Sequence, residues 1–261
     1  MQTLDRVVRR GSHDSHVIPL PFVGLQRLGF GLARGQLGMV VAGPGVGKSA
    51  FALQIALAAR VPALYISADT DSWTMTVRTL AYNTGHPQSY IVACLEPGVE
   101  APDDIDVALH NARNVQFSFD TYTTREINDD VLAYGVVHGA YPDLIVVDNV
   151  RNFAHDGDNE VSAQQKVMSE LHALAQTTGA HVLALHHATG QYHDGDRAVP
   201  MSGVENKITH LAAQVLTLHK QDPYVFAVPV KNRLGKASPG AKDMHVRLRF
   251  DGDRQTYHDQ E

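Results

Sequence analysis

The stretch LGMVVAGPGVGKSAFALQIALAA, residues 37–59, decides the fold of this chain. Its first six residues are a short apolar run, which predicts a strand buried on both faces. A glycine-rich loop follows, and the residues after Ser49 have the length and composition of a helix. Strand, glycine loop and helix in this order predict a phosphate-binding loop, formed by Ala42, Gly43, Pro44, Gly45, Val46, Gly47, Lys48 and Ser49.

The chemistry of this loop indicates a nucleoside triphosphate with Mg²⁺. Glycines let the backbone curl closely around phosphates, and the helix that begins near Ser49 adds the positive end of its dipole. Lys48 would reach the β- and γ-phosphates, and the Ser49 hydroxyl would bind Mg²⁺. An ordinary glycine-rich turn is the alternative, and Ala42 replaces the usual first glycine, but the flanking strand and helix favour the phosphate loop. We therefore expect ATP and Mg²⁺ as cofactors.

Short apolar runs alternate with helical patterns from residue 37 onward. The expected strands are 37–42, 63–67, 144–148, 181–186, 215–219 and 226–230. The expected helices are 49–60, 72–84, about 126–141 and 162–178. This alternation predicts an α/β fold with a mostly parallel central sheet flanked by helices. Proline and glycine punctuate the beginning of the chain, so we expect an N-terminal arm or linker over 1–34 and one domain over 35–261.

A second ligand for the metal should close a later apolar strand. Asp148 ends the run DLIVVD and is the best candidate, binding Mg²⁺ directly or through water. The alternative is a loop or helix-capping aspartate, because such residues also follow buried strands.

Composition limits the other classes of function. The 22 basic and 28 acidic residues give a net charge of −6, so nucleic-acid binding would need a local basic patch. The 15 histidines and single cysteine show no zinc-ligand spacing, and we expect neither a zinc site nor an internal disulfide. The chain has neither a signal-peptide core nor an apolar run long enough for a membrane span. We expect a cytoplasmic protein with no membrane partner.

In order along the chain, several segments resemble the RecA-type ATPase core of the DnaB-like replicative helicases. GFGLARGQLGMVVAGPGVGKSAFALQIALAA is similar to the family's entry segment, phosphate loop and first helix. ALYISADTDSWTMTVRTLA, MSGVENKITHLAAQVLTLHK, VPVKNRLGKA and MHVRLRFDGDRQTY resemble later segments, down to a closing hairpin. LALHHATG departs from this pattern and is closer to RepA-type plasmid helicases. The resemblance implies a RecA-like P-loop NTPase core.

The resemblance also assigns roles to four further residues. Asp69 stands where the family has a catalytic glutamate that orients the attacking water, and its shorter side chain implies slow or partner-stimulated hydrolysis. His187 stands at the position of a polar γ-phosphate sensor. Lys231 and Arg233 match a basic finger that acts on the nucleotide of a neighbouring subunit. Exposed or structural positions are the alternative interpretation for all four.

Three functions follow from this interpretation. The first is a hexameric, helicase-like ATPase acting on single-stranded DNA in replication or recombination, with loops 152–161 and 190–202 contacting DNA. Both loops are acidic, which speaks against strong contact with phosphates. The second is a filament-forming recombinase ATPase. The third is a nucleotide-switched helicase loader or regulatory adaptor that binds other replication proteins. A virus- or plasmid-encoded origin would suit such a compact core.

Overall fold

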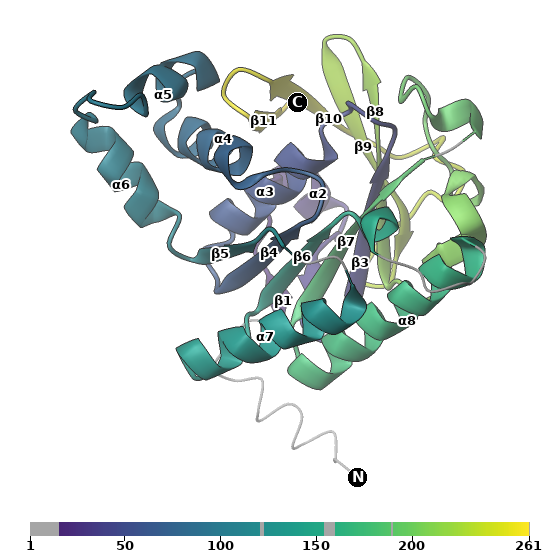
Figure 1. Ribbon diagram of the computed structural model, residues 1–261. Coiled ribbons are helices and arrows are strands. Elements are labelled where there is room, and N and C mark those ends of the chain that lie inside the picture. Colours follow the sequence, from purple (N-terminus) through teal and green to yellow (C-terminus); the bar gives the residue numbers. More distant parts are fainter. Residues whose placement is uncertain (1–15, 121–122, 154–159, 189, 261) are drawn as a thin grey trace.

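A nine-stranded sheet forms the centre of the molecule, and helices cover both of its faces (Figure 1). The computed structural model describes residues 16–120, 123–153, 160–188 and 190–260. Along the sheet the strands follow the order β11-β10-β9-β8-β3-β7-β6-β4-β5. The six strands from β8 to β5 are parallel, whereas β9, β10 and β11 extend the sheet antiparallel to their neighbours.

The parallel part confirms the predicted α/β fold and its phosphate loop. Its strands are β3 (Leu37–Ala42), β4 (Ala63–Ser67), β5 (Val115–Ser118), β6 (Leu144–Asp148), β7 (His181–His187) and β8 (Gln214–Gln221). Its helices are α3 (Lys48–Ala58), α4 (Ser72–Thr84), α5 (Gln88–Cys94), α6 (Asp103–Asn111), α7 (Thr124–His138) and α8 (Glu160–Thr178). Short 3₁₀ turns lie at η1 (Val150–Asn152), η2 (Gly190–Tyr192), η3 (Met201–Gly203) and η4 (Glu205–His210).

Two hydrophobic cores lie on opposite faces of the sheet, because successive strand residues point to opposite sides. In β3, Val40 and Ala42 face the core beneath α3, while Met39 and Val41 face the core beneath α7 and α8. Every residue of β3 is buried, which explains why this strand is a continuous apolar run. None of the described helices is both long and apolar enough to cross a bilayer.

Residues 16–34 pack onto the first of these cores. They form β1 (Val17–Ile18), α2 (Val23–Arg27) and β2 (Leu32–Ala33). Phe22 is buried and its ring stacks on that of Phe51 in α3, with centroids 4.6 Å apart. The glycines and prolines that suggested an arm therefore separate short packed elements. The boundary at residue 34 stays a prediction, and residues 1–15 lie outside the described part.

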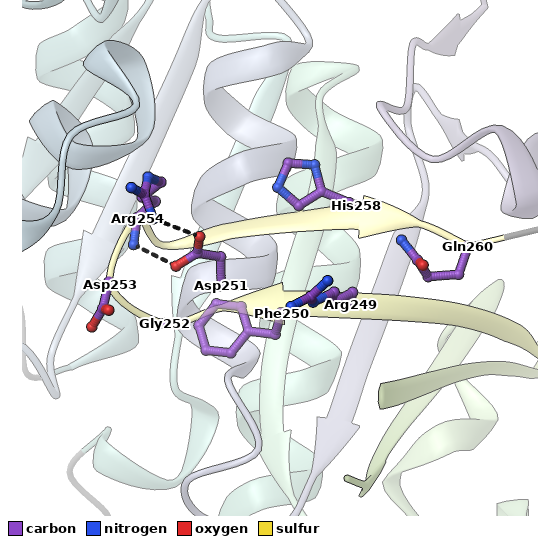
Figure 2. A pocket seen from close by; sticks show the side chains of 8 residues that line it. All are labelled: Arg249, Phe250, Asp251, Gly252, Asp253, Arg254, His258 and Gln260. Atoms are coloured by element: carbon purple, nitrogen blue, oxygen red, sulfur yellow. Dashed lines mark hydrogen bonds and ion pairs between the residues drawn. The ribbon is translucent and has the colours of Figure 1, made fainter. Parts of the chain in front are cut away.

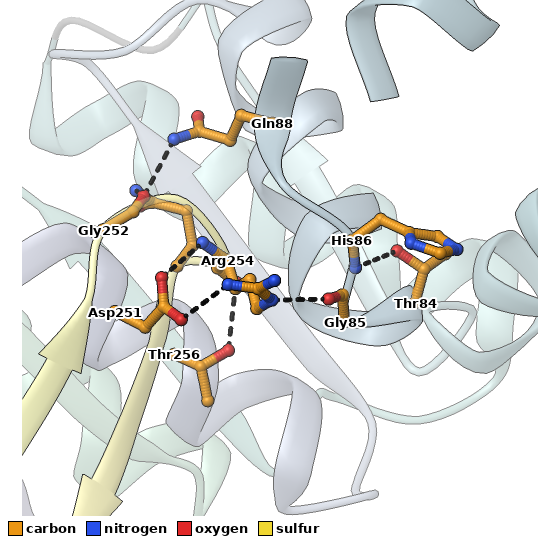
Figure 3. Close-up of polar contacts among 9 residues, drawn as sticks. Thr84, Gly85, His86, Gln88, Asp251, Gly252, Arg254 and Thr256 are labelled. Atoms are coloured by element: carbon orange, nitrogen blue, oxygen red, sulfur yellow. Dashed lines mark hydrogen bonds and ion pairs between the residues drawn. The ribbon is translucent and has the colours of Figure 1, made fainter. Parts of the chain in front are cut away.

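The antiparallel extension consists of β9 (Tyr224–Asn232), β10 (Val246–Asp251) and β11 (Thr256–Asp259). Its β10–β11 turn is fastened to the end of α4 (Figure 3). The Arg254 Nε donates to the Gly85 carbonyl at 2.8 Å, and the Gln88 amide donates to the Gly252 carbonyl at 3.0 Å. Arg254 also pairs with Asp251 at 3.0 Å. These contacts hold the hairpin over the carboxyl ends of β3 and β4, where the phosphate loop begins.

Candidate nucleotide site

The phosphate loop connects β3 to α3 and depends on two glycines in left-handed conformations. Gly45 has a φ of 73° and Gly47 a φ of 101°, values that residues with a Cβ rarely adopt. A Cβ on Gly47 would also lie 2.1 Å from the Tyr257 hydroxyl. That hydroxyl lies 3.1 Å from the carbonyl oxygens of both Val46 and Gly47. The closing hairpin therefore supports the loop that the sequence predicted.

Lys48 begins α3 and is buried, with 7% of its surface exposed. Its ammonium donates to the carbonyls of Ala42 and Gly43 at 3.3 Å and contacts the His187 Nδ1 at 3.2 Å. Burial lowers the pKa of Lys48 to about 8, against the charges of Asp148 and Asp69, which raise it. A buried cation surrounded by backbone carbonyls is well suited to receive phosphate oxygens.

Ser49 and Asp148 lie together, as expected of a metal site. Asp148 ends β6, is buried, and accepts hydrogen bonds from the Ser49 hydroxyl and, at 2.8 Å, from the Tyr65 hydroxyl. Burial raises the pKa of the Asp148 carboxyl, and the two hydrogen bonds oppose this rise. A hydroxyl beside a buried carboxylate is an oxygen donor pair that fits Mg²⁺. Their role as ligands stays a prediction.

Asp69 follows β4 and its side chain is exposed toward the same site. One carboxylate oxygen accepts from Asn149 at 2.8 Å and the other from Asn152 at 2.7 Å. Both asparagines follow β6 directly, so two neighbouring parallel strands place these groups together. The carboxylate is thus oriented by two amides that were not singled out in the sequence.

His187, at the end of β7, links these groups. Its Nδ1 contacts Lys48, and its Nε2 lies 3.2 Å from the Asn149 amide nitrogen. Burial lowers the pKa of His187 to about 4, so the ring is neutral at pH 7. A neutral imidazole has one acceptor nitrogen, and it therefore accepts from Lys48 or from Asn149 but not from both. The neighbouring His186 is buried on the other face of the strand.

Lys231 and Arg233 do not join this group within one chain. Lys231 pairs with Val215 in β8, and the Arg233 amide donates to Ala213, both near the amino end of β8. The phosphate loop follows the carboxyl end of the adjacent β3. The Lys231 ammonium donates to the carbonyls of Thr209 and His210 at 2.8 and 3.1 Å, while Arg233 is exposed.

A cavity of about 380 Å³ lies over the phosphate loop. Besides the predicted residues, its lining includes Arg78 from α4 and Phe250 and Gln255 from the closing hairpin. These three come from distant parts of the chain and carry no local motif, so sequence reasoning missed them. Asn149 could have been found, because it directly follows Asp148 at a strand end.

The loop after β7 packs against the phosphate loop. A Cβ on Gly43 would lie 2.3 Å from the His193 carbonyl oxygen, and one on Gly195 would lie 2.2 Å from Val46. The Lys220 amide of β8 donates to the Gly195 carbonyl at 2.7 Å. Of the two loops expected to contact DNA, the second therefore has part of its backbone against the nucleotide site. Residues 154–159 of the first lie outside the described residues.

Comparison with known proteins supports this description. The AAA domain family matches residues 26–191, more than half of the chain. The Gene 65 protein of Mycobacterium phage L5 is 36% identical over 96% of this chain and 95% of its own length. The Gene 65 protein of Mycobacterium phage D29 is 37% identical over 85% of this chain and 98% of its own.

Two solved structures share the fold over the whole of this chain, each at 17% sequence identity. The first, a separate ATPase domain, is matched over its full length with a TM-score of 0.82. The second, a DnaB-like replicative helicase solved in a study of its interactions with primase, is matched over 68% of its length with a TM-score of 0.81. The chain thus belongs to the AAA domain family, is a relative of these mycobacteriophage proteins, and has the RecA-like fold of DnaB-like helicase ATPase domains.

Proposed function

We propose that this protein is an ATP-hydrolysing, helicase-like motor that acts on single-stranded DNA in replication or recombination. The observation that carries the proposal is the meeting of five side chains around one cavity. Lys48, Ser49, Asp69, Asp148 and His187 come from four different segments and line the same space over the phosphate loop. Binding, metal coordination and water activation each need a different one of these groups.

Their chemistry suits phosphoryl transfer. Lys48 would bind the β- and γ-phosphate oxygens and neutralise charge that develops on them. Ser49 and Asp148 would hold Mg²⁺, which when bound stabilises charge on the phosphates. Asp69 would orient the attacking water, with Asn149 and Asn152 fixing its carboxylate. The shorter side chain of aspartate supports slow basal hydrolysis that a partner accelerates.

The competition at His187 suggests how the site responds to nucleotide. A γ-phosphate would draw the Lys48 ammonium away from the imidazole, because a charged acceptor forms a stronger hydrogen bond. His187 could then accept from Asn149, which also holds Asp69. The adjoining loop, including Gly195, packs on the phosphate loop and would be affected by this exchange.

Completion of the site between subunits follows from the position of the basic pair. Lys231 and Arg233 lie at the opposite end of the sheet from their own phosphate loop, so they could serve only the nucleotide of another subunit. Lys231 spends two N–H groups on its own backbone, which orients the ammonium and leaves one for a phosphate. A homo-oligomer, either a hexameric ring or a filament, would supply the neighbour.

The relatives bear on origin and partners. Those reported above come from mycobacteriophages, which supports a phage-encoded protein working in the cytoplasm of a host cell. The DnaB-like helicase among the solved structures interacts with primase, so other replication proteins are reasonable partners here.

A regulatory adaptor is the second candidate. Asp194 and Asp196 are exposed next to the phosphate loop, and only Arg197 offsets them locally. Such an acidic segment suits a protein partner better than a phosphate backbone.

Paired assays separate the candidates. Binding of a labelled oligonucleotide and ATP turnover would be measured at low salt, with Lys48→Ala as the nucleotide-site control. The motor proposal expects the oligonucleotide to bind and to raise turnover of the unsubstituted protein only. Turnover without DNA binding or stimulation would reject the motor and favour the adaptor.

A further inference from the structure

The antiparallel extension presents aromatic and basic side chains on the face that is turned away from the phosphate loop. Phe250 and Tyr257 point toward that loop. Successive strand residues alternate between faces, so Arg249 and His258 point the other way. Arg249 is paired across the sheet with His258 on one side and with Tyr224 on the other. These three side chains therefore form one row across three strands.

A second row lies beside the first. Phe226 is paired with His219 on one side and with Arg247 on the other. The rings of Phe226 and His219 are stacked with centroids 5.3 Å apart, and the Arg247 guanidinium lies 4.9 Å from the centre of the Tyr224 ring. This cation–π contact joins the two rows and restricts Arg247. We call Tyr224, Phe226, Arg247, Arg249 and His258 the aromatic-basic face.

Positive charge prevails at this face because most of the nearby acids are already engaged. Asp259 accepts hydrogen bonds from the backbone amides that begin α2, Asp251 pairs with Arg254, and Asp222 pairs with Lys220. Among the described residues, no ion pair links Arg249 to an acid. Asp253, in the β10–β11 turn, is the exposed acid at one end.

Two hollows border the aromatic-basic face. One has a volume of about 610 Å³, and Arg249, His258 and Gln260 lie along it (Figure 2). The other, of about 780 Å³, is lined by Tyr224, Phe226 and Arg247 and also by Arg27 and Gln260. Gln260 belongs to both, so the two hollows adjoin and together offer room for several nucleotides.

We propose that the aromatic-basic face binds single-stranded DNA. This inference rests on the proposed motor function and gives it a DNA-binding surface. Bases stack on aromatic rings and on guanidinium planes, while arginines bind the phosphates that join them. The face supplies both kinds of group, whereas the loop at 190–203 offers one arginine beside two aspartates. It also lies on the hairpin that supports the phosphate loop through Tyr257, which would connect DNA binding to nucleotide binding.

The test compares the full chain with two double variants in binding to a fluorescent oligo-dT of about 20 nucleotides. Arg247→Ala/Arg249→Ala removes two charges from the face. Arg113→Ala/Arg125→Ala removes two exposed charges elsewhere and is the matched control. Fluorescence anisotropy is recorded over a salt series, and melting temperatures confirm folding. We expect the first variant to bind about tenfold more weakly with a shallower salt dependence, and the control to bind like the unsubstituted protein.

Stacking is tested separately with Tyr224→Leu, which keeps an apolar side chain but removes the ring. We expect weaker binding to oligo-dT and unchanged binding to an abasic oligonucleotide of the same length, because only the former has bases to stack. Equal losses in the face variant and the charge control would overturn the inference, as would a Tyr224→Leu variant that binds both ligands normally. If the unsubstituted protein hydrolyses ATP but binds no oligo-dT, the motor function itself fails.

Discussion

The parallel half of the sheet and its antiparallel extension divide the work of the site between them. The parallel half ends in the chemical groups: Lys48, Ser49, Asp69, Asp148 and His187 follow the carboxyl ends of β3, β4, β6 and β7. The extension brings none of these groups, yet it places Tyr257 beneath the phosphate loop and Phe250 against the cavity. It also carries Lys231 and Arg233 at its far end.

The difference teaches that chemistry and support are encoded differently. Parallel strands converge at one edge, so short polar residues after them meet without further specification. The extension must instead reach the site through specific contacts, such as the hydrogen bonds of Arg254 to Gly85 and of Gln54 to Tyr257. Substitutions in the two halves should therefore fail in different ways.

Removal of Lys48 breaks the parallel half and should have the largest effect. Lys48→Ala is expected to reduce ATP turnover by about 100-fold or more, because a buried cation that meets the phosphates is lost. Stability should not fall, since a buried charge disappears as well. Turnover and urea unfolding are the measurements, with the exposed Lys242→Ala as control. Near-normal turnover of Lys48→Ala would place the site elsewhere.

Substitution of Tyr257 weakens the contact between the halves. Tyr257→Phe keeps the buried ring but removes the hydroxyl at the Val46 and Gly47 carbonyls. We expect a loss of about 1 kcal/mol in unfolding free energy and several-fold weaker ATP binding, because the loop is less fixed. Urea unfolding and titration with a fluorescent ATP analogue measure both. Tyr224→Phe, which lacks this contact, serves as the control, and identical behaviour of the two variants would remove the supporting role of the extension.

Acid sensitivity sharpens the comparison from the side of the parallel half. His181 in β7 is fully buried, its Nδ1 lies 2.9 Å from the Ala33 carbonyl, and burial lowers its pKa to about 4. Below an ordinary pKa of about 6.5, the unfolded chain binds a proton that the folded chain excludes. Stability should therefore fall as the pH drops from 6.5 to 4, by at most about 1.4 kcal/mol per pH unit for this group.

His181→Asn keeps a donor near the Ala33 carbonyl and removes the titration. Urea unfolding at several pH values should show a shallower acid slope for this variant than for the unsubstituted protein. The same slope in both proteins would mean that His181 titrates alike in the folded and unfolded chains.

The same division explains what the sequence could predict of the fold. Strands 37–42, 63–67 and 144–148 are confirmed at both ends, because strands buried on both faces are continuous apolar runs with sharp limits. Helices α5 and α6 and strand β5 were not predicted, since they are short and partly exposed. Strands β10 and β11 were anticipated only through the family resemblance, because half-exposed strands carry a weaker pattern.

The candidate site shows a similar limit. Lys48 and Ser49 were identified by a local motif and Asp148 by its place after an apolar strand. Tyr65 and Arg78 carry no such signal, and only the folded chain brings them to Asp148 and the cavity. Whether a site lies between subunits depends on a neighbour that no single chain contains.

Mixing two inactive variants tests whether the halves of neighbouring subunits build one site. Lys48→Ala lacks the phosphate-loop cation and keeps Arg233, whereas Arg233→Ala has the reverse. Each alone should turn over ATP about 100-fold more slowly than the unsubstituted protein. Random mixing in equal amounts should restore about a quarter of the sites, because an intact loop then faces an intact finger. Normal turnover of Arg233→Ala alone, or a mixture no more active than its two components, would contradict a site shared between subunits.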